Sequence, residues 1–278
     1  WNFLKMQATE LLKIAVKKLE DVGIASAMLD ARVLLQFATQ KPKEYFLAHP
    51  NAEVEEEFFL QLLERRLKRE PISHITGKKE FYGREFEVNS HVLTPRPDTE
   101  LIIDTAKEHF KTSEKLNILE LGVGSGCIIL TLLAEFPNSG GLGVDISHNA
   151  LAIAKKNAYN LGVTSIEFCC SDWTKEIKPQ KFDLVISNPP YIKADEEKNL
   201  EAELRFEPKI ALYAGSSGLD AYRQIADELK NVIFRHAIFE IGQGQENDVT
   251  NIFKENGFTL IDAKKDLAGI VRVLVFTK

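Results

Sequence analysis

The stretch NILELGVGSG, residues 117–126, joins an apolar run to a loop with glycine at every second position. The run has the length and composition of a buried strand, and the segment after the loop has apolar residues at helical spacing. A strand, a glycine turn and a helix in this order are typical of an α/β sheet. The dinucleotide fingerprint G-x-G-x-x-G would need glycine at Cys127, and no Lys-Ser/Thr pair follows, so neither that motif nor a P-loop fits.

The segments after this loop continue to alternate between strand and helix patterns. We predict strands in NILEL, GLGVD, SIEFCC, FDLVIS, RHAIFEIG, FTLIDA and IVRVLVFTK, with helical patterns in most of the gaps. This alternation predicts a parallel sheet with right-handed crossovers. Only KKDLAG separates the last two strands, which is too short for a crossover helix, so the final strand must run antiparallel. The prediction is a seven-stranded α/β sheet with its last strand reversed.

The N-terminal part has apolar residues at helical spacing and shows no strand pattern. We predict three helices there, in ATELLKIAVKKLEDVG, AMLDARVLLQFA and AEVEEEFFLQLLERRLKR. Gly23 would end the first helix, Ser26 would cap the second and Asn51 would cap the third. These segments predict a small N-terminal helical bundle.

A hairpin is expected between the two parts, because KKEFYGREFEVN alternates aromatic and charged residues around a Tyr-Gly pair. Pro97 and Asp98 then suit the start of a helix. We therefore expect a helical domain over residues 1–74, a hairpin linker over 75–95 and the α/β domain over 96–278.

The composition is that of a globular protein, with 44% hydrophobic and 27% charged residues among 278. No apolar run reaches the ~18 residues that a membrane span needs, and charges interrupt the first segment, unlike a signal peptide. Three cysteines and scattered histidines without metal-ligand spacing predict a cytoplasmic protein without a metal. The net charge of −6 argues against nucleic acid as the main partner, without excluding a local basic patch.

Carboxylates follow the next two predicted strands. Asp145 ends the second strand, where a carboxylate can accept hydrogen bonds from both hydroxyls of a ribose. Asp172 and Trp173 follow the third strand, where they suit an adenine amino group and a purine face. With the glycine loop, these residues predict a site for an adenosine-type ligand without a pyrophosphate. Simpler readings are a tight turn for the glycines, a helix cap for Asp145 and core packing for Trp173.

The segment SNPPY, residues 187–191, ends the fourth predicted strand. Its two prolines lack a backbone N–H and cannot extend a ladder, so they make this edge of the sheet rigid. The Asn188 side-chain oxygen and the Pro189 carbonyl can accept the hydrogens of an amide nitrogen, and Tyr191 can pack on a planar amide. Ligands of open α/β sheets bind at this edge. The alternative reading is a strand terminator with a turn.

Taken in chain order, LELGVGSG, VDIS, SDW and SNPPY resemble the HemK-type protein-(glutamine-N5) methyltransferases that act on peptide chain release factors. TPRPDTE, FEPKIAL, SGLDAYR and DLAGIVR match as well, so the resemblance covers nearly the whole chain. NPPY alone is less specific, because methyltransferases that act on adenine amino groups share it. Glu120 stands where the family often has Asp, and Ala214 where Gly is common. Arg96 and Glu207 lie in matching segments, and the sequence defines no role for them.

The resemblance implies a Rossmann-like methyltransferase sheet that uses S-adenosylmethionine and releases S-adenosylhomocysteine. The implied reaction is N5-methylation of the glutamine in the Gly-Gly-Gln motif of a release factor, a protein of translation termination that would dock on the helical domain. Neither nucleic acid nor membrane is an expected partner. The implied donor-binding residues are Gly122, Val123, Gly124, Ser125, Gly126, Asp145, Asp172, Trp173 and Asn188. The implied residues for the target amide are Asn188, Pro189, Pro190 and Tyr191, with catalysis by Asn188, Pro189 and Tyr191.

Two alternatives to this reading stay open. The same chemistry would also suit a ribosomal-protein glutamine or an adenine amino group, and the acidic charge balance disfavours the second. A protein of another class would hold a nucleoside without turning it over, which the intact Asn188 disfavours. A nicotinamide dehydrogenase is disfavoured further, by Cys127 and by the reversed last strand.

Overall fold

The structure is a computed structural model that describes residues 5–278, apart from the side chains of 197–199. The chain divides into two compact units. The first unit contains the residues up to Gly77 together with Ala202–Phe206, and the second contains Lys78–Glu201 and Glu207–Lys278. Within the described residues, we find no helix that combines the length and apolar character that a membrane crossing requires.

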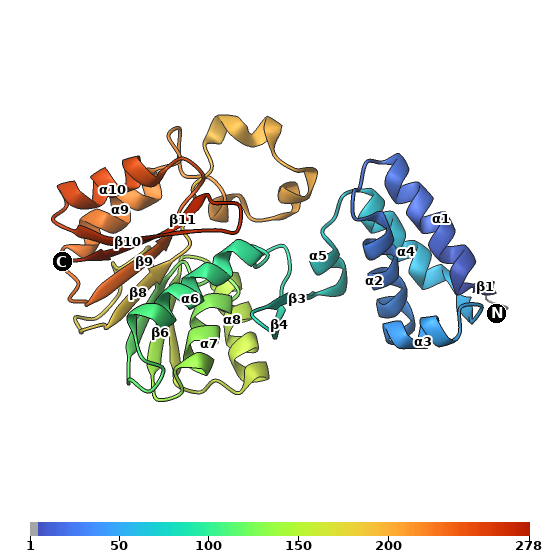
Figure 1. Cartoon of the computed structure of the whole chain (residues 1–278), viewed down its shortest axis with the longest axis horizontal. Helices are drawn as coiled ribbons and strands as arrows, with labels where there is room; N and C mark the ends of the chain where they lie inside the picture. The colour runs from blue at the N-terminus through green and yellow to red at the C-terminus, as the bar shows by residue number, and fades with distance from the viewer. Residues whose placement is uncertain (1–4) are drawn as a thin grey trace. The chain divides into compact units, whose positions relative to one another are not determined.

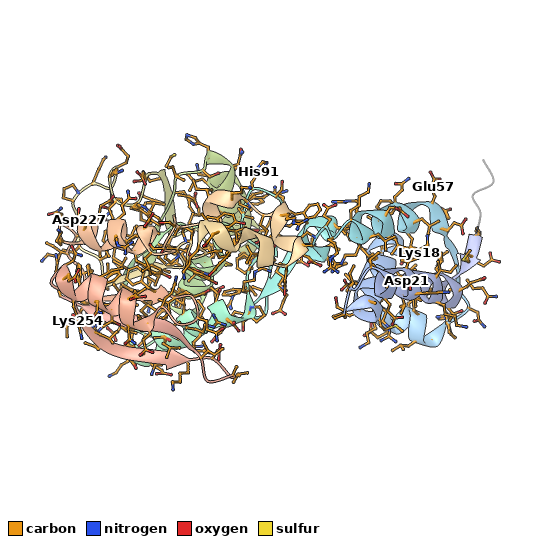
Figure 2. The ribbon with its side chains drawn as sticks, turned by 90° about the horizontal axis from the view of Figure 1, so that it is seen from above. Lys18, Asp21, Glu57, His91, Asp227 and Lys254 are labelled. Carbon is orange, nitrogen blue, oxygen red and sulfur yellow. The ribbon has the colours of Figure 1, made fainter. Side chains whose placement is uncertain are left out.

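The first unit is built mainly of helices, and the apolar faces of the three longest pack together. Leu11, Leu34 and Phe59, one from each of these helices, are fully buried in its core. The helices carry charged residues such as Lys18, Asp21 and Glu57 on their exposed sides (Figure 2). Its elements are β1 (Lys5–Gln7), α1 (Ala8–Asp21), α2 (Ala27–Thr39), α3 (Lys43–Ala48), β2 (Glu53–Glu55), α4 (Glu56–Leu67) and α5 (Ile72–Thr76).

The structure corrects three expectations for this unit. A short antiparallel pair, β1–β2, exists where no strand was predicted. Because Glu53–Glu55 pairs with β1, α4 begins only at Glu56, and Asn51 is not its cap. Ser26 does precede α2, but its side chain makes no capping hydrogen bond. Gly23 follows the end of α1 with a φ of +74°, as expected for a glycine that terminates a helix.

A buried ion cluster holds the 202–206 segment in the first unit. Arg66 on α4 contacts Asp30 at 2.7 Å and Glu203 at 3.0 Å. The side chains of Arg66 and Asp30 are only 7% and 8% exposed. A buried guanidinium is stable only when anions and hydrogen bonds compensate it, so these carboxylates are structurally required.

The second unit is a seven-stranded sheet in the order β10-β11-β9-β8-β5-β6-β7. The predicted strand segments agree with the observed strands to within two residues at each end. The strands are β5 (Asn117–Leu121), β6 (Gly140–Asp145), β7 (Ile166–Cys170), β8 (Leu184–Ser187), β9 (His236–Glu240), β10 (Thr259–Lys265) and β11 (Val271–Thr277).

The last strand runs antiparallel to both of its neighbours, β9 and β10, whereas β5 to β9 are parallel. The predicted reversal is therefore confirmed. Figure 1 shows helices on both faces of the sheet, and two separate apolar clusters fill the two interfaces. The first face carries α6 (Glu100–His109), α7 (Cys127–Glu135) and α8 (His148–Leu161), and the second carries α9 (Asp220–Leu229) and α10 (Glu246–Glu255).

Two short elements lie ahead of this sheet in the chain. The predicted hairpin is formed by β3 (Lys78–Phe81) and β4 (Arg84–Glu87), and both turn residues, Tyr82 and Gly83, have positive φ, which suits a tight hairpin turn. A 3₁₀ turn, η1 (Pro97–Thr99), then leads into α6.

Between β8 and α9 the chain forms three further 3₁₀ turns that were not predicted: η2 (Ala194–Asn199), η3 (Ala202–Phe206) and η4 (Lys209–Ala211).

Candidate functional site

A cavity of ≈ 340 Å³ lies at the carboxyl edge of the sheet, where β5, β6, β7 and β8 end. Its volume falls within the range of small-molecule sites. The described residues that line it all belong to the second unit. The lining includes these predicted site residues: Gly122, Val123, Gly124, Ser125, Asp145, Asp172, Trp173, Asn188, Pro189 and Pro190. Gly126 and Tyr191 are not among the described lining residues.

The glycine loop is shaped by left-handed backbone. Gly122, Gly124 and Gly126 have φ values of +74°, +53° and +80°, which side chains rarely tolerate. The N–H groups of Gly122 and Val123 both donate to the Val144 carbonyl, at 2.9 and 2.8 Å, which ties the loop to β6. A Cβ on Gly126 would lie 3.0 Å from the Leu130 side chain, so this glycine serves the packing of α7.

Asp145 bridges the glycine loop and the start of α8. One carboxylate oxygen accepts the Gly124 N–H at 2.9 Å, and the other accepts the Ser147 N–H at the same distance. Burial raises its pKa, and these backbone donors act in the opposite direction. The side chain that caps α8 is Ser147, which accepts the Ala150 N–H. Asp145 therefore presents a fixed carboxylate to the cavity.

Asp172 and Trp173 form the wall that follows β7. Asp172 pairs with Lys175 and accepts a hydrogen bond from Gln224 at 3.3 Å. Trp173 has a φ of +52°, an uncommon conformation for a bulky residue. A Cβ on Gly122 would lie 3.7 Å from the Trp173 ring, so the indole stands directly beside the glycine loop.

SNPPY leaves an unpaired acceptor in the cavity wall. Ser187 closes the strand by donating to the Leu121 carbonyl at 2.6 Å. The Asn188 Nδ2 donates to the Thr99 hydroxyl at 3.2 Å, whereas its Oδ1 is buried and has no hydrogen-bond partner in the described protein. A buried polar atom without a partner costs about 1–3 kcal/mol, so an incoming N–H group would find favourable contact here.

Tyr191 lies just outside the lining, and its position is tightly fixed. Its carbonyl accepts from the Gln245 side chain at 3.0 Å, and a Cβ on Gly242 would lie 3.0 Å from its ring. A Cβ on Gly218 would lie 2.5 Å from its carbonyl. Burial, and secondarily the charge of Glu240, raise the pKa of Tyr191 to about 12, so its hydroxyl stays protonated.

Sequence analysis did not single out Thr99, and it left Arg96 and Glu207 without a role. Thr99 lines it and contacts Asn188, although 89 residues separate them. Arg96 donates to both oxygens of the buried Glu207 carboxylate, at 2.8 and 2.9 Å. Burial raises the pKa of Glu207, and Arg96 opposes this rise. Both segments carried motif matches, but the pairing itself has no local signal.

Glu120 lies near the end of β5, just before the glycine loop, and also lines the cavity. Its carboxylate accepts the Ile129 N–H at 3.0 Å near the start of α7. Complete burial raises its pKa well above the ordinary value. Glu120 therefore links the end of β5 to the first turn of α7, and the glycine loop lies between these two points.

The fold and two family models define the class of the protein. Residues 98–212 match the methyltransferase small domain, and residues 10–77 match the PrmC N-terminal domain. A methyltransferase from Pyrococcus furiosus superposes with a TM-score of 0.53 and 15% identity, covering 72% of this chain and 91% of that one. At this identity the likeness shows the fold alone, and the chain has a methyltransferase fold.

Two relatives narrow this class to a family. The release factor glutamine methyltransferase of Caulobacter vibrioides is 41% identical over 271 residues, covering 95% of this chain and 94% of its own. The chain belongs to the release factor glutamine methyltransferase family. The bifunctional methyltransferase of Rickettsia felis is 42% identical over 302 residues, covering 96% of this chain. The chain spans 57% of that relative, about half its length.

Proposed function

We propose that this protein transfers a methyl group from S-adenosylmethionine to the side-chain amide nitrogen of the glutamine in a release factor's Gly-Gly-Gln motif. The family relationship supports this activity, because close relatives carry the name release factor glutamine methyltransferase. The observation that carries it is the unpaired Oδ1 of Asn188, a residue that lines the same cavity as the glycine loop and Asp145. One cavity thus combines an adenosine-type site with an acceptor suited to an amide.

The donor half of the cavity fits S-adenosylmethionine, which supplies an activated methyl group on a positively charged sulfur. The glycine loop, Gly122 to Gly126, would approach its amino-acid end, because no side chain obstructs the backbone there. Asp145 would accept hydrogen bonds from the ribose hydroxyls. Asp172 and Trp173 would contact the adenine. S-adenosylhomocysteine would leave the same site, and the methylated, positively charged nitrogen would release one proton to water without a general base. A metal has no role in this proposal.

The amide half addresses the weak nucleophilicity of a carboxamide, whose lone pair is delocalised into the carbonyl. Asn188 Oδ1 and the Pro189 carbonyl would accept the two N–H hydrogens and place the nitrogen in line with the methyl group. Both acceptors are uncharged and are held by rigid backbone, so little reorganisation is needed. Orientation of this kind supplies roughly 7–11 kcal/mol in well-aligned intramolecular reactions. Pro190 and Tyr191 would complete the contact with the planar amide.

The helical unit is our candidate for docking the release factor. Several of its large apolar side chains are exposed, including Leu29 at 64% and Leu47 at 69%. Exposed apolar residues in so small a unit suit a protein partner better than a nucleic acid. We assign docking to residues 1–74, the link to 75–95 and catalysis to 96–278. A cytoplasmic location is the expected setting for this partner.

The test is incorporation of labelled methyl from S-adenosylmethionine. The purified protein is incubated separately with intact release factors, ribosomal proteins, DNA and RNA, and mass spectrometry locates the label. Label on the release-factor glutamine, lost in Asn188→Ala, is the expected result. Label on a ribosomal-protein glutamine or on adenine would refute the substrate assignment. Donor binding without transfer to any of these substrates would favour the nucleoside-binding alternative.

A further inference from the structure

The site has a buried carboxylate that the proposed mechanism does not use. Glu240 is the last residue of β9, and the residue is only 3% exposed to solvent. β8 and β9 are parallel neighbours with Ser187 opposite Phe239, so the next residues in register are Asn188 and Glu240. Residues opposite each other project to the same face. The Tyr222 hydroxyl donates to the Glu240 carbonyl at 2.9 Å and fixes the backbone there.

The Glu240 carboxylate lies close to the Thr99 hydroxyl and the Asn188 carboxamide, and both neighbours favour its ionised form. Its Oε2 is buried and has no hydrogen-bond partner in the described protein. The Asn188 Nδ2 donates to the Thr99 hydroxyl. These three side chains form one buried group, in which the donor atom of Asn188, Nδ2, faces Thr99 and the Glu240 carboxylate. The Asn188 Oδ1 lies outside these contacts and has no partner among the described residues.

The alternative orientation of the Asn188 carboxamide is unfavourable. Rotation by half a turn would exchange Nδ2 and Oδ1, placing an amide oxygen against the Glu240 carboxylate. Two acceptors would then face each other in a buried environment, and the hydrogen bond from Nδ2 to Thr99 would be lost. Thr99 alone does not select an orientation, because a hydroxyl both donates and accepts. The carboxylate, which can only accept when ionised, makes the selection.

We infer that Glu240 is a positioning residue, which acts with Thr99 to orient the Asn188 carboxamide so that Oδ1, and not Nδ2, meets the substrate nitrogen. Glu240 is not among the described residues that line the cavity, so it acts through Asn188. The inference rests on the proposed function for its substrate. The orientation of Asn188 can be measured without that substrate.

The ionisation of Glu240 is tuned to neutral pH. Burial raises the pKa of Glu240 to about 7, opposed chiefly by Thr99. Protonation would turn one oxygen into a donor and remove the selection described above. The methyl-transfer rate should therefore rise with pH through about 7, and the positive donor would lower this midpoint. The titratable or charged groups facing Glu240 are Arg272 on β11, Asp98 in η1, Tyr191 after β8, Tyr222 on α9 and Cys127 on α7.

The first test measures single-turnover methyl transfer in Glu240→Leu, Glu240→Gln and Thr99→Val. Glu240→Leu should lower the methyl-transfer rate about 10- to 100-fold, as expected when one interaction with a charged group is lost. The affinity for S-adenosylmethionine should stay within about threefold of the wild-type affinity. Glu240→Gln should lose less, because its amide oxygen still accepts, and its rate should no longer change near pH 7. The matched control is Thr131→Val, since Thr131 is fully buried on α7 and its hydroxyl has no partner in the described protein. The control should keep the wild-type rate.

The second test follows the Asn188 side-chain amide by ¹⁵N NMR, with Asn188→Ala identifying the signal. In the wild type this signal should move with pH around a midpoint near 7, and in Glu240→Gln it should not.

An unchanged rate in a folded Glu240→Leu would overturn the inference. A pH-independent Asn188 signal in the wild type would also overturn it. If Glu240→Leu fails to fold, Thr99→Val and Glu240→Gln carry the test. Absence of methyl transfer by the wild type would refute the proposed function, while the NMR result still decides the inference.

Discussion

The two halves of the cavity differ in how their polar atoms are satisfied. In the donor half, backbone N–H groups of the adjoining loops already contact both oxygens of Asp145. In the amide half, two buried acceptor atoms, Asn188 Oδ1 and Glu240 Oε2, have no hydrogen-bond partner among the described residues. The donor half is therefore preformed by local backbone. The amide half holds unused hydrogen-bonding capacity, which a substrate amide would fill under the proposed function.

The strongest test of this comparison is removal of the unpaired acceptor. Asn188→Ala should lower single-turnover methyl transfer about 100- to 1000-fold, as for loss of one preorganised polar contact. Its thermal unfolding midpoint should fall only modestly, because the substitution removes the Nδ2 hydrogen bond to Thr99, whereas Oδ1 makes no hydrogen bond in the folded protein. Rapid-quench kinetics and calorimetry measure these two quantities. Transfer within tenfold of the wild type would remove Asn188 from the mechanism.

The second test uses the stability of the amide half against pH. The folded protein holds the Glu240 proton up to about pH 7, whereas the unfolded chain releases it near pH 4.5. The stability from this proton is fully present below about pH 4.5 and is lost as pH rises through 7. Relative to wild type, Glu240→Gln should gain about 3 kcal/mol between pH 4.5 and 8, because one pKa unit is about 1.4 kcal/mol.

Denaturant unfolding of both proteins at several pH values measures this difference, and other titrating groups cancel in it. A difference that stays constant with pH would show that Glu240 is ionised throughout. The amide half would then be as well satisfied as the donor half.

The third test probes the donor half. Asp145→Asn should weaken S-adenosylmethionine binding about 10- to 100-fold, because hydrogen bonds to a charged group are worth about 1.5–3 kcal/mol. Isothermal titration calorimetry gives the dissociation constant directly. Asp172→Asn is a useful comparison, since Lys175 and Gln224 already engage that carboxylate. Equal effects of the two substitutions would contradict a special role for Asp145.

The smallest expected effect concerns the backbone of the glycine loop, which is tested at Gly126. Gly162, at the end of α8, is the reference position outside the loop. Gly162→Ala, at a helix end with open space around it, should cost about 1 kcal/mol for its positive φ. Gly126→Ala should cost more, because its Cβ would also press on Leu130. The free energy of unfolding from urea titration compares the pair. A greater cost at Gly162 would show that contact with Leu130 is easily relieved.

The sequence predicts the strands, the glycine loop and the reversed last strand well, because their signals are local. Strand, glycine loop and helix follow one another over a few residues, and the short KKDLAG segment alone dictates the reversed last strand. SNPPY likewise marks its own position. The Thr99–Asn188–Glu240 group, in contrast, joins η1, the end of β8 and the end of β9. It emerges only when the strand order is known.

The first unit shows a different limit of sequence reasoning. The strands β1 and β2 have three residues each, and their pairing leaves no alternating pattern long enough to recognise. Asn51 has the right residue type for a cap, but pairing of the residues after it delays the helix. Tertiary contacts override local preference most easily in such short segments.

The buried Arg66 cluster restricts how this protein can be recombined with its relatives. The chain enters the α/β unit at Lys78, leaves it for Ala202–Phe206 and returns at Glu207. A chimera that exchanged only the N-terminal helices would inherit Glu203 from one parent and Arg66 with Asp30 from the other. Any mismatch would bury an uncompensated charge, a cost of about 3–5 kcal/mol. The N-terminal helices and the short segment after SNPPY therefore constitute one inheritable module, although 124 residues of α/β chain, Lys78–Glu201, lie between them.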